Sequence, residues 1–402
     1  MQPRTEGDSV LSVHDHGTLL STPSEELTMK DKLSRRRLLG AIGTAAAVGL
    51  AGCSLLGSGG EQADVGEGVE TVDFVGANPP TDEPTNAPPF GDRVLPLPVS
   101  RKQMRESATD GGPGKDGIPA IDDPVFVSSD EAEVSGEATV FGARYDGEAK
   151  AYPRAILVNH EIVNDTLGST PVSVTYCPLT GTAQGFERGE TTLGVSGMLV
   201  NNNLIMYDRA AERWWPQIAA ASIPGPWHDT DGGATLREFE VVWTTLDQWT
   251  ALYPETTVLS EETGYARNYN RDPYASRGYY ESDSTIFANI YENDQFHAKK
   301  LVYGARTSEG AIAVTRDRLH GDGIVTGQLG DTPILAVHDS RLDTAWFYRN
   351  PEQQEFTRDG DQLVGPDGDA WPPDELPLDR IISFDAYWFA WFAYYPNTEL
   401  YE

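Results

Sequence analysis

Residues Val140–Arg144 read VFGAR, and 162 residues later Val302–Arg306 read VYGAR. The same offset relates Leu167–Pro171 (LGSTP) to Leu329–Pro333 (LGDTP), and 16 of the 49 positions from 140 to 188 are identical. A weaker match follows at an offset of 142 and pairs Trp249, Tyr253, Pro254 and Thr256 with Trp391, Tyr395, Pro396 and Thr398. A period this long is typical of a duplicated domain and not of a solenoid. We therefore expect two related halves from an internal duplication.

The local pattern around these repeats indicates a β-rich α+β fold. Residues 161–164 and 172–176 predict two strands of a hairpin with Gly168 in the turn. The matched blocks place the first half at 116–262, a connector at 263–298 and the second half at 299–402.

The predicted hairpin brings His160 and Cys177 towards each other. If Asp165 pairs with Pro171, His160 stands opposite Tyr176, and a shift of one residue would place His160 opposite Cys177. In either register the two residues meet at the open end of the hairpin.

The N-terminal 53 residues predict a twin-arginine lipoprotein signal. Arg35 and Arg36 precede an apolar run that ends at Cys53 in the sequence LAGC, and the run is too short to span a bilayer. Met29 is the expected true start. A lipid on Cys53 would be the membrane partner and would anchor the protein to the outer face of the cytoplasmic membrane. Residues 54–115, rich in Gly, Pro and acidic residues, predict a disordered tether.

The charge balance points to a salt-adapted protein. The chain carries 62 acidic and 30 basic residues, a formal charge of -32, and the acids are dispersed along a sequence with 10% aromatic residues. Such a surface is typical of halophilic proteins and keeps them soluble in high salt. It excludes nucleic acid as a partner, because no basic patch could neutralise the phosphates.

The candidate chemistry lies in the first half, around Cys177. If Cys53 carries a lipid, Cys177 is the remaining cysteine and has no disulfide partner in an oxidising environment. At an offset of 162, His160 faces Asp322 and Cys177 faces Asp339. Residues that serve only the shared fold should recur in both halves. We therefore expect the site in the first half and a structural role for the second.

The favoured hypothesis is a soft-metal site that serves a redox or trafficking role. A thiolate and an imidazole suit copper, or alternatively zinc. Cys177 and His160 would supply two ligands, with Met206 and Asp208 as further ligands. The spacing of these residues matches no standard metal motif.

Two alternatives stay open. In the first, Cys177 is the nucleophile of an extracellular enzyme, His160 is its base, and Asp165, Asn164 or Glu161 orients the base. In the second, the protein is a ligand-binding or structural surface module and Cys177 is inert and buried. The substrate, the ligand and any protein partner do not follow from the sequence.

Several strings from about Asp116 to the C-terminus resemble the domain of unknown function 3179 family. Together with the signal and the acidic composition, they predict an exported haloarchaeal lipoprotein member of that family. The strings that carry the resemblance are Ala151–Pro153, His160–Asp165, Tyr176–Leu179, Ser196-Gly197, Met206–Arg209, Trp215, Gln217, Pro273-Tyr274 and Trp388–Trp391. The resemblance implies no activity, since the family is uncharacterised. Some members carry a second cysteine where this chain has Thr180, so a dithiol redox centre is excluded within this motif.

Overall fold

The computed structural model describes residues 73–75, 84–228 and 233–402. The predicted signal, Cys53 and residues 54–72 and 76–83 of the predicted tether lie outside the described residues. Within the described part of the chain, no helix combines the length and apolar character needed to cross a membrane.

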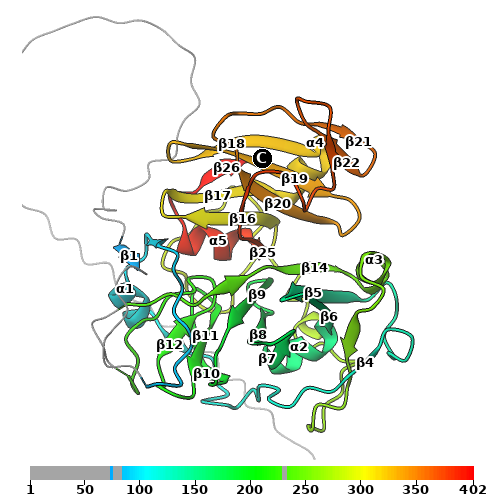
Figure 1. Cartoon of the computed structure of the whole chain (residues 1–402). Coiled ribbons are helices and arrows are strands. Elements are labelled where there is room, and N and C mark those ends of the chain that lie inside the picture. Colours follow the sequence, from blue (N-terminus) through cyan, green and yellow to red (C-terminus); the bar gives the residue numbers. More distant parts are fainter. Residues whose placement is uncertain (1–72, 76–83, 229–232) are drawn as a thin grey trace, which may run out of the picture. The chain divides into compact units, whose positions relative to one another are not determined.

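The first half is built on three sheets (Figure 1). One sheet has the order β14-β5-β6-β15-β4, a second has the order β13-β9-β8-β7, and a third has the order β12-β11-β10-β3. All neighbours are antiparallel except β15 and β6. The bounds are β3 Thr109–Asp110, β4 Phe126–Ser128, β5 Thr139–Tyr145, β6 Glu148–Pro153, β7 Ile162–Leu167, β8 Thr170–Cys177, β9 Thr182–Glu187, β10 Leu193–Val200, β11 Asn203–Asp208, β12 Trp214–Pro216, β13 Glu238–Phe239, β14 Val241–Thr245 and β15 Thr257–Leu259.

The second half has two sheets of similar order and one small sheet of its own. The orders are β25-β16-β17-β26, β18-β19-β20-β24 and β21-β22-β23, and the paired strands β1 Asp73–Val75 and β2 Leu95–Leu97 precede both halves. The bounds are β16 Leu301–Thr307, β17 Gly310–Thr315, β18 Ile324–Leu329, β19 Thr332–Asp339, β20 Thr344–Arg349, β21 Thr357–Asp359, β22 Gln362–Val364, β23 Ala370–Trp371, β24 Asp379–Ile381, β25 Ser383–Tyr387 and β26 Glu399–Tyr401.

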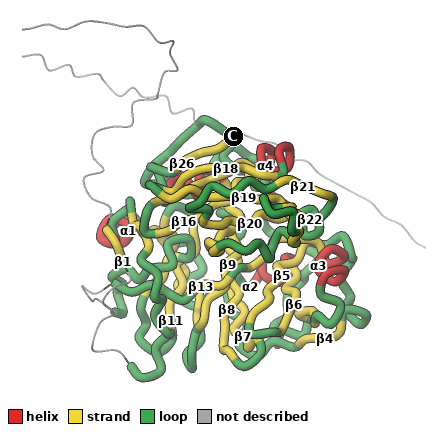
Figure 2. Tube along the Cα trace, turned by 45° about the horizontal axis from the view of Figure 1, so that its top comes forward, coloured by secondary structure: helices red, strands yellow, loops and turns green. Residues whose placement is uncertain are grey.

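The helices are short, and Figure 2 shows α1, α3 and α4 at the margins of the view. They are α1 Arg101–Glu106, α2 Arg154–His160, α3 Leu246–Leu252, α4 Arg316–Asp322, α5 Trp388–Tyr394 and the 3₁₀ turn Ala275–Arg277. The described chain is therefore β-rich with few helices and several sheets, as the sequence predicts.

The order of elements in the first half recurs in the second. Each start and end of β5, β6, α2, β7, β8 and β9 is matched 162 residues later by β16, β17, α4, β18, β19 and β20. After the region where the halves differ, β14, α3 and β15 are matched 142 residues later by β25, α5 and β26. The differing region holds β10–β12 in the first half and β21–β23 in the second.

The two halves also build their cores from the same positions. Leu157, Val163 and Leu167 are buried in the core of the first half. Their counterparts at the offset of 162, Leu319, Val325 and Leu329, are buried in the core of the second. In both halves, residues from a pair of sheets and from the short helix α2 or α4 fill this core.

A glycine packed against a tryptophan recurs with the same geometry. A Cβ atom on Gly142 would lie 2.2 Å from the ring of Trp249, and one on Gly304 would lie 2.0 Å from the ring of Trp391. The indole of Trp249 donates to the Thr256 hydroxyl at 2.9 Å. Each tryptophan thus fits flat against its strand only because the strand carries no side chain there.

Further cores join the halves. Trp249 of α3 belongs to the same buried cluster as Val337 and Trp346 of the second half. Trp388 of α5 belongs to a cluster with Trp214 and Ile205 of the first half. The helix that ends each half therefore shares a core with strands of the other half.

The structure differs from the expected tether over residues 84–115. Leu95, Leu97 and Val99 are fully buried, and Met104 of α1 is buried as well. Leu97, Val99 and Met104 pack into a core that the two halves share, and Leu95 packs into a core of the first half. A stretch rich in Pro and Gly can follow a fixed path over a folded surface when its few apolar side chains are buried, so composition alone does not indicate disorder here.

Candidate functional site

The predicted hairpin between β7 and β8 is confirmed. Gly168 has a φ of 60° in its two-residue turn, a conformation that suits glycine. Asp165 pairs with Val172, not with Pro171. This is the shifted register, in which position 160 stands opposite position 177. Ile162 is the first paired residue, however, because His160 belongs to the end of α2.

His160 is fully buried, and both of its ring nitrogens have protein partners. Nδ1 lies 2.7 Å from the carbonyl of Pro119 and Nε2 lies 2.7 Å from the hydroxyl of Tyr269. Since a carbonyl only accepts, Nδ1 carries the proton and Nε2 accepts from Tyr269. Burial lowers the pKa of His160, which keeps the ring neutral. The imidazole thus fastens the 263–298 segment to the first half.

The thiol of Cys177 lies in an apolar core and not beside the partners of His160. It is buried together with Met206 and Trp215, and its sulfur lies 3.6 Å from the carbonyl of Asn202. Burial, and then the neighbouring Glu161, raise the pKa of Cys177 to about 11. Since the thiolate is the form that attacks carbon or binds soft metals, this environment favours the alternative in which Cys177 is inert. Among the described residues no hydrogen bond joins Cys177 to His160.

The other predicted site residues also have structural partners. Asp165 accepts from Lys150 at 3.0 Å and from the hydroxyl of Tyr152 at 2.7 Å. Asp208 accepts from the indole of Trp215 at 2.9 Å and from the backbone of Ala211 at 2.6 Å. Met206 is fully buried beside Cys177 in the core. The structure brings Met206 and Cys177 into one cluster and directs Asp165 and His160 elsewhere.

Glu161, between the two predicted residues, is the unusual group. It follows α2 and adopts the left-handed conformation, with a φ of 60°. A residue with a Cβ in this region is strained, and such residues gather at functional sites. The residue is only 5% exposed. None of the described residues forms a hydrogen bond with its carboxyl group.

A cavity of about 230 Å³ opens beside Glu161. Its walls come from β10, β11, the hairpin end and the 263–298 segment, and they include Leu179, Met198, Leu199, Leu204, Tyr274, Ile286 and Phe287. Gly111 and Pro113 close it from the N-terminal side, and the exposed Arg277 also lines it. The segments predicted as a connector and as a tether therefore complete the cavity.

Electrostatics set Glu161 apart from an ordinary surface acid. Burial raises its pKa to about 8, with no compensating partner. Burial, and then Glu161, raise the pKa of Tyr274. At neutral pH the cavity therefore presents uncharged proton donors, a carboxylic acid and a phenol, among apolar side chains. Such a site can donate hydrogen bonds to a ligand or a proton to a reacting group.

The sequence indicates Glu161 only as one of three residues that could orient a catalytic histidine. A signal for it was present in the repeat, since Glu161 is matched at offset 162 by Gly323, which has a φ of 73°. The first half thus has an acid, Glu161, where the second half has a left-handed glycine, and this exchange indicates the unusual position.

The protein is β-rich, and a similar pair of sheets occurs in each half. The first half also has a buried acid, Glu161, which lines a cavity and has no side-chain hydrogen-bond partner among the described residues. A family model described as "Protein of unknown function (DUF3179)" matches residues 115–398. The chain belongs to this family, which confirms the resemblance carried by the sequence. Comparisons with curated proteins and with solved structures find no match.

Proposed function

We propose that the protein is a ligand-binding module whose first half holds a small molecule against Glu161. The observation that carries this proposal is a strained, buried carboxyl group that lines a cavity and has no hydrogen-bond partner among the described residues. The carboxyl oxygens are open to the cavity and not sealed in the core. A ligand with a hydrogen-bond acceptor could therefore reach the protonated carboxyl group and accept a hydrogen bond from it.

The cavity restricts the ligand's size and chemistry. Its volume of about 230 Å³ is below the roughly 300–1,000 Å³ of sites for drug-sized molecules. Apolar residues such as Leu179, Leu204 and Phe287 line it, so the body of the ligand is apolar. Glu161 would donate to an acceptor such as a carbonyl oxygen, and Arg277 would attract an anionic or strongly polar end.

The other two functional hypotheses stay predictions with less support. A soft-metal site or a thiol nucleophile at Cys177 needs a thiolate, and burial raises the pKa of this thiol to about 11. His160 would have to release Pro119 or Tyr269 before it could act as a ligand or a base. Binding at Glu161 requires neither change.

Infrared difference spectroscopy tests the state of Glu161 directly. The purified chain should show a protonated carboxyl band at neutral pH that disappears on raising the pH and is missing in Glu161→Gln. Small carbonyl compounds, tested one by one for stabilisation of the fold, should stabilise the native chain. They should also stabilise Glu161→Gln, which keeps a donor, but not Glu161→Ala.

The matched control is Glu255→Gln, which removes an exposed carboxyl group. It should leave both the band and ligand stabilisation unchanged. If Glu161→Ala is stabilised by the same compounds as the native chain, Glu161 does not contact the ligand and the proposal fails.

The cellular setting is part of the proposal. We infer that a lipid on Cys53 anchors the protein outside the cell, that its surface is adapted to high salt, and that an internal duplication produced the two halves. The twin-arginine and LAGC strings, the charge of -32 and the shared offset support these inferences. Cys53→Ala should move the protein from the membrane fraction to the medium, and normal retention of that variant would exclude the anchor.

A further inference from the structure

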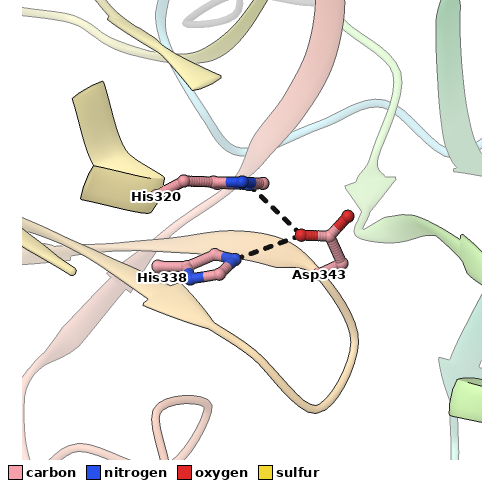
Figure 3. A group of neighbouring side chains, drawn as sticks. All are labelled: His320, His338 and Asp343. Carbon is pink, nitrogen blue, oxygen red and sulfur yellow. Dashed lines mark hydrogen bonds and ion pairs between the residues drawn. The ribbon is translucent and has the colours of Figure 1, made fainter. Parts of the chain in front are cut away.

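Two histidines and an aspartate converge in the second half (Figure 3). His320 lies on α4, His338 on β19, and Asp343 in the turn between β19 and β20. Figure 3 shows both rings directed at the same carboxylate oxygen. Among the described residues, these three form the one group of His, Cys, Asp or Glu whose possible metal-ligand atoms all lie within 4.8 Å of one another.

The two distances from the histidines to the aspartate match those between ligands of a single metal ion. Nε2 of His320 and Nε2 of His338 each lie 3.2 Å from Oδ1 of Asp343. Around a zinc ion with bonds of about 2.0–2.1 Å, neighbouring ligand atoms are about 2.9–3.4 Å apart, depending on octahedral or tetrahedral geometry. The side chains could therefore bind one ion with little movement.

Arg316 holds the carboxylate in place. It binds Oδ2 of Asp343 and leaves Oδ1 directed at the histidines. A partner that orients a metal ligand in this way is a regular feature of metal sites. The two imidazole rings are 4.1 Å apart between centroids, inclined by 32°. The hydroxyl of Tyr303 lies 3.0 Å from Nε2 of His320, the nitrogen that would bind the ion, so this contact would open on metal binding.

The site is open enough to admit an ion. The side chains of His320 and His338 are 32% and 15% exposed, and that of Asp343 is 39% exposed. Three protein ligands with solvent on one side leave positions for water or a further ligand.

These residues are not required by the shared fold. At the offset of 162, the first half has Val158, Tyr176 and Gly181 at the three positions. Gly181 has a φ of 60°, and Asp343 has a φ of 54°. The second half therefore carries an aspartate at a left-handed position where the first half has glycine, so the turn itself does not require the carboxylate.

We propose that His320, His338 and Asp343 form a site for a divalent transition metal ion, such as Zn²⁺ or Co²⁺. Two imidazole nitrogens and one carboxylate oxygen are ligands of intermediate softness, which suit these ions better than Cu(I) or Ca²⁺. The second half, predicted from the sequence to be structural only, would then carry a site of its own.

Cobalt binding to the full mature chain provides the test. After chelator treatment and dialysis at high KCl, Co²⁺ should bind with one ion per chain, give visible absorption bands and be displaced by Zn²⁺. His320→Val and Asp343→Gly place the residues of the first half at these positions, so the backbone can accept both changes. Each variant should weaken binding at least about tenfold, the smallest loss expected from even an indirect partner of the metal.

His297→Gln is the matched control, because it removes a half-exposed histidine that is not part of the cluster. It should bind Co²⁺ as the native chain does. The proposal is overturned if the native chain binds no Co²⁺ or Zn²⁺. It is also overturned if His320→Val and Asp343→Gly, with circular dichroism and melting curves that show a folded protein, bind as tightly as the native chain. Loss of binding in Cys177→Ser instead would place the metal in the first half.

Discussion

Positions 161 and 323 occupy the same place in the two halves, at the end of α2 and of α4, and both have a left-handed backbone. The first half has a buried glutamate there, and the second has glycine. Positions 181 and 343 show the reverse, with glycine in the first half and an aspartate in the second. Each half thus retains glycine at one tight turn and has a strained acid at the other.

This exchange separates what the fold requires from what a site requires. Glycine is the residue that adopts the left-handed region without strain, so it satisfies the fold at both positions. An acid there costs on the order of 1–3 kcal/mol. The extra side chain faces a cavity in the case of Glu161 and two histidines in the case of Asp343. The strained acids therefore mark a different site in each half.

The largest expected difference between the halves concerns an arginine that recurs in both. Arg306 is fully buried and pairs with Glu238 at 2.8 Å, whereas its counterpart Arg144 is exposed. Removing one partner of a buried pair costs up to about 3–5 kcal/mol, less where a second partner remains, as Arg93 does at 3.0 Å from Glu238. Exposed substitutions usually cost less than about 0.5 kcal/mol. Arg306→Met should therefore lower the free energy of unfolding strongly and Arg144→Met hardly at all, as measured by denaturant titration. Equal losses of unfolding free energy in the two variants would contradict the different roles assigned to Arg306 and Arg144.

The next prediction concerns packing that the halves share. Gly142→Ala and Gly304→Ala each place a methyl group against a tryptophan ring, and each should cost about 3 kcal/mol, the upper part of the range for overpacking. Gly321→Ala is the control, because Gly321 lies in α4 with open space around it. It should raise the melting temperature slightly, since alanine favours helix. Tolerance of one core substitution but not of the other would show that the two tryptophans pack differently.

The third prediction uses the pH dependence of stability. The pKa of Glu161 is raised by burial from its ordinary value of 4.5 to about 8, so the folded state holds a proton that the unfolded state loses between these values. Stability should therefore fall as pH rises from about 4.5 to about 8 and then level off. Glu161→Gln should remove the part of this fall that comes from position 161, several kcal/mol at about 1.36 kcal/mol per unit of pKa shift.

The difference between the two melting curves isolates Glu161 from other groups. Burial also raises the pKa of Asp385 in the second half, to about 7, and this carboxyl group contributes in the same direction in both proteins. Parallel curves from about pH 5 to about pH 9 for the native chain and Glu161→Gln would contradict the assignment of a buried acid to the cavity.

The smallest expected effect compares the two left-handed positions. Gly323→Ala should cost about 1 kcal/mol, because alanine is strained at a φ of 73°. Glu161→Gly should relieve strain at the matching position and leave the melting temperature at neutral pH unchanged or higher, while abolishing ligand stabilisation. A thermal melt of each variant decides the matter. A lower melting temperature for Glu161→Gly would show that the glutamate serves packing and not a site.

The sequence by itself determined the β-rich fold, the family and the hairpin from Ile162 to Cys177. The offset of 162 found in short strings of the sequence also relates the bounds of strands and helices in the two halves. These features depend on residues close along the chain, on turn glycines and on alternating apolar side chains, all of which a local pattern records.

Only the tertiary structure decided which of these residues belong to a site. His160 ends α2 and Cys177 ends β8, and their side chains enter different surroundings. Arg144 and Arg306 are identical in sequence and opposite in burial. Burial, pKa and the convergence of ligand atoms depend on which distant segments cover a side chain. A pattern of neighbours along the chain does not contain that information, whereas the fold supplies it by bringing Tyr274, Phe287 and Gly111 to the cavity that Glu161 lines.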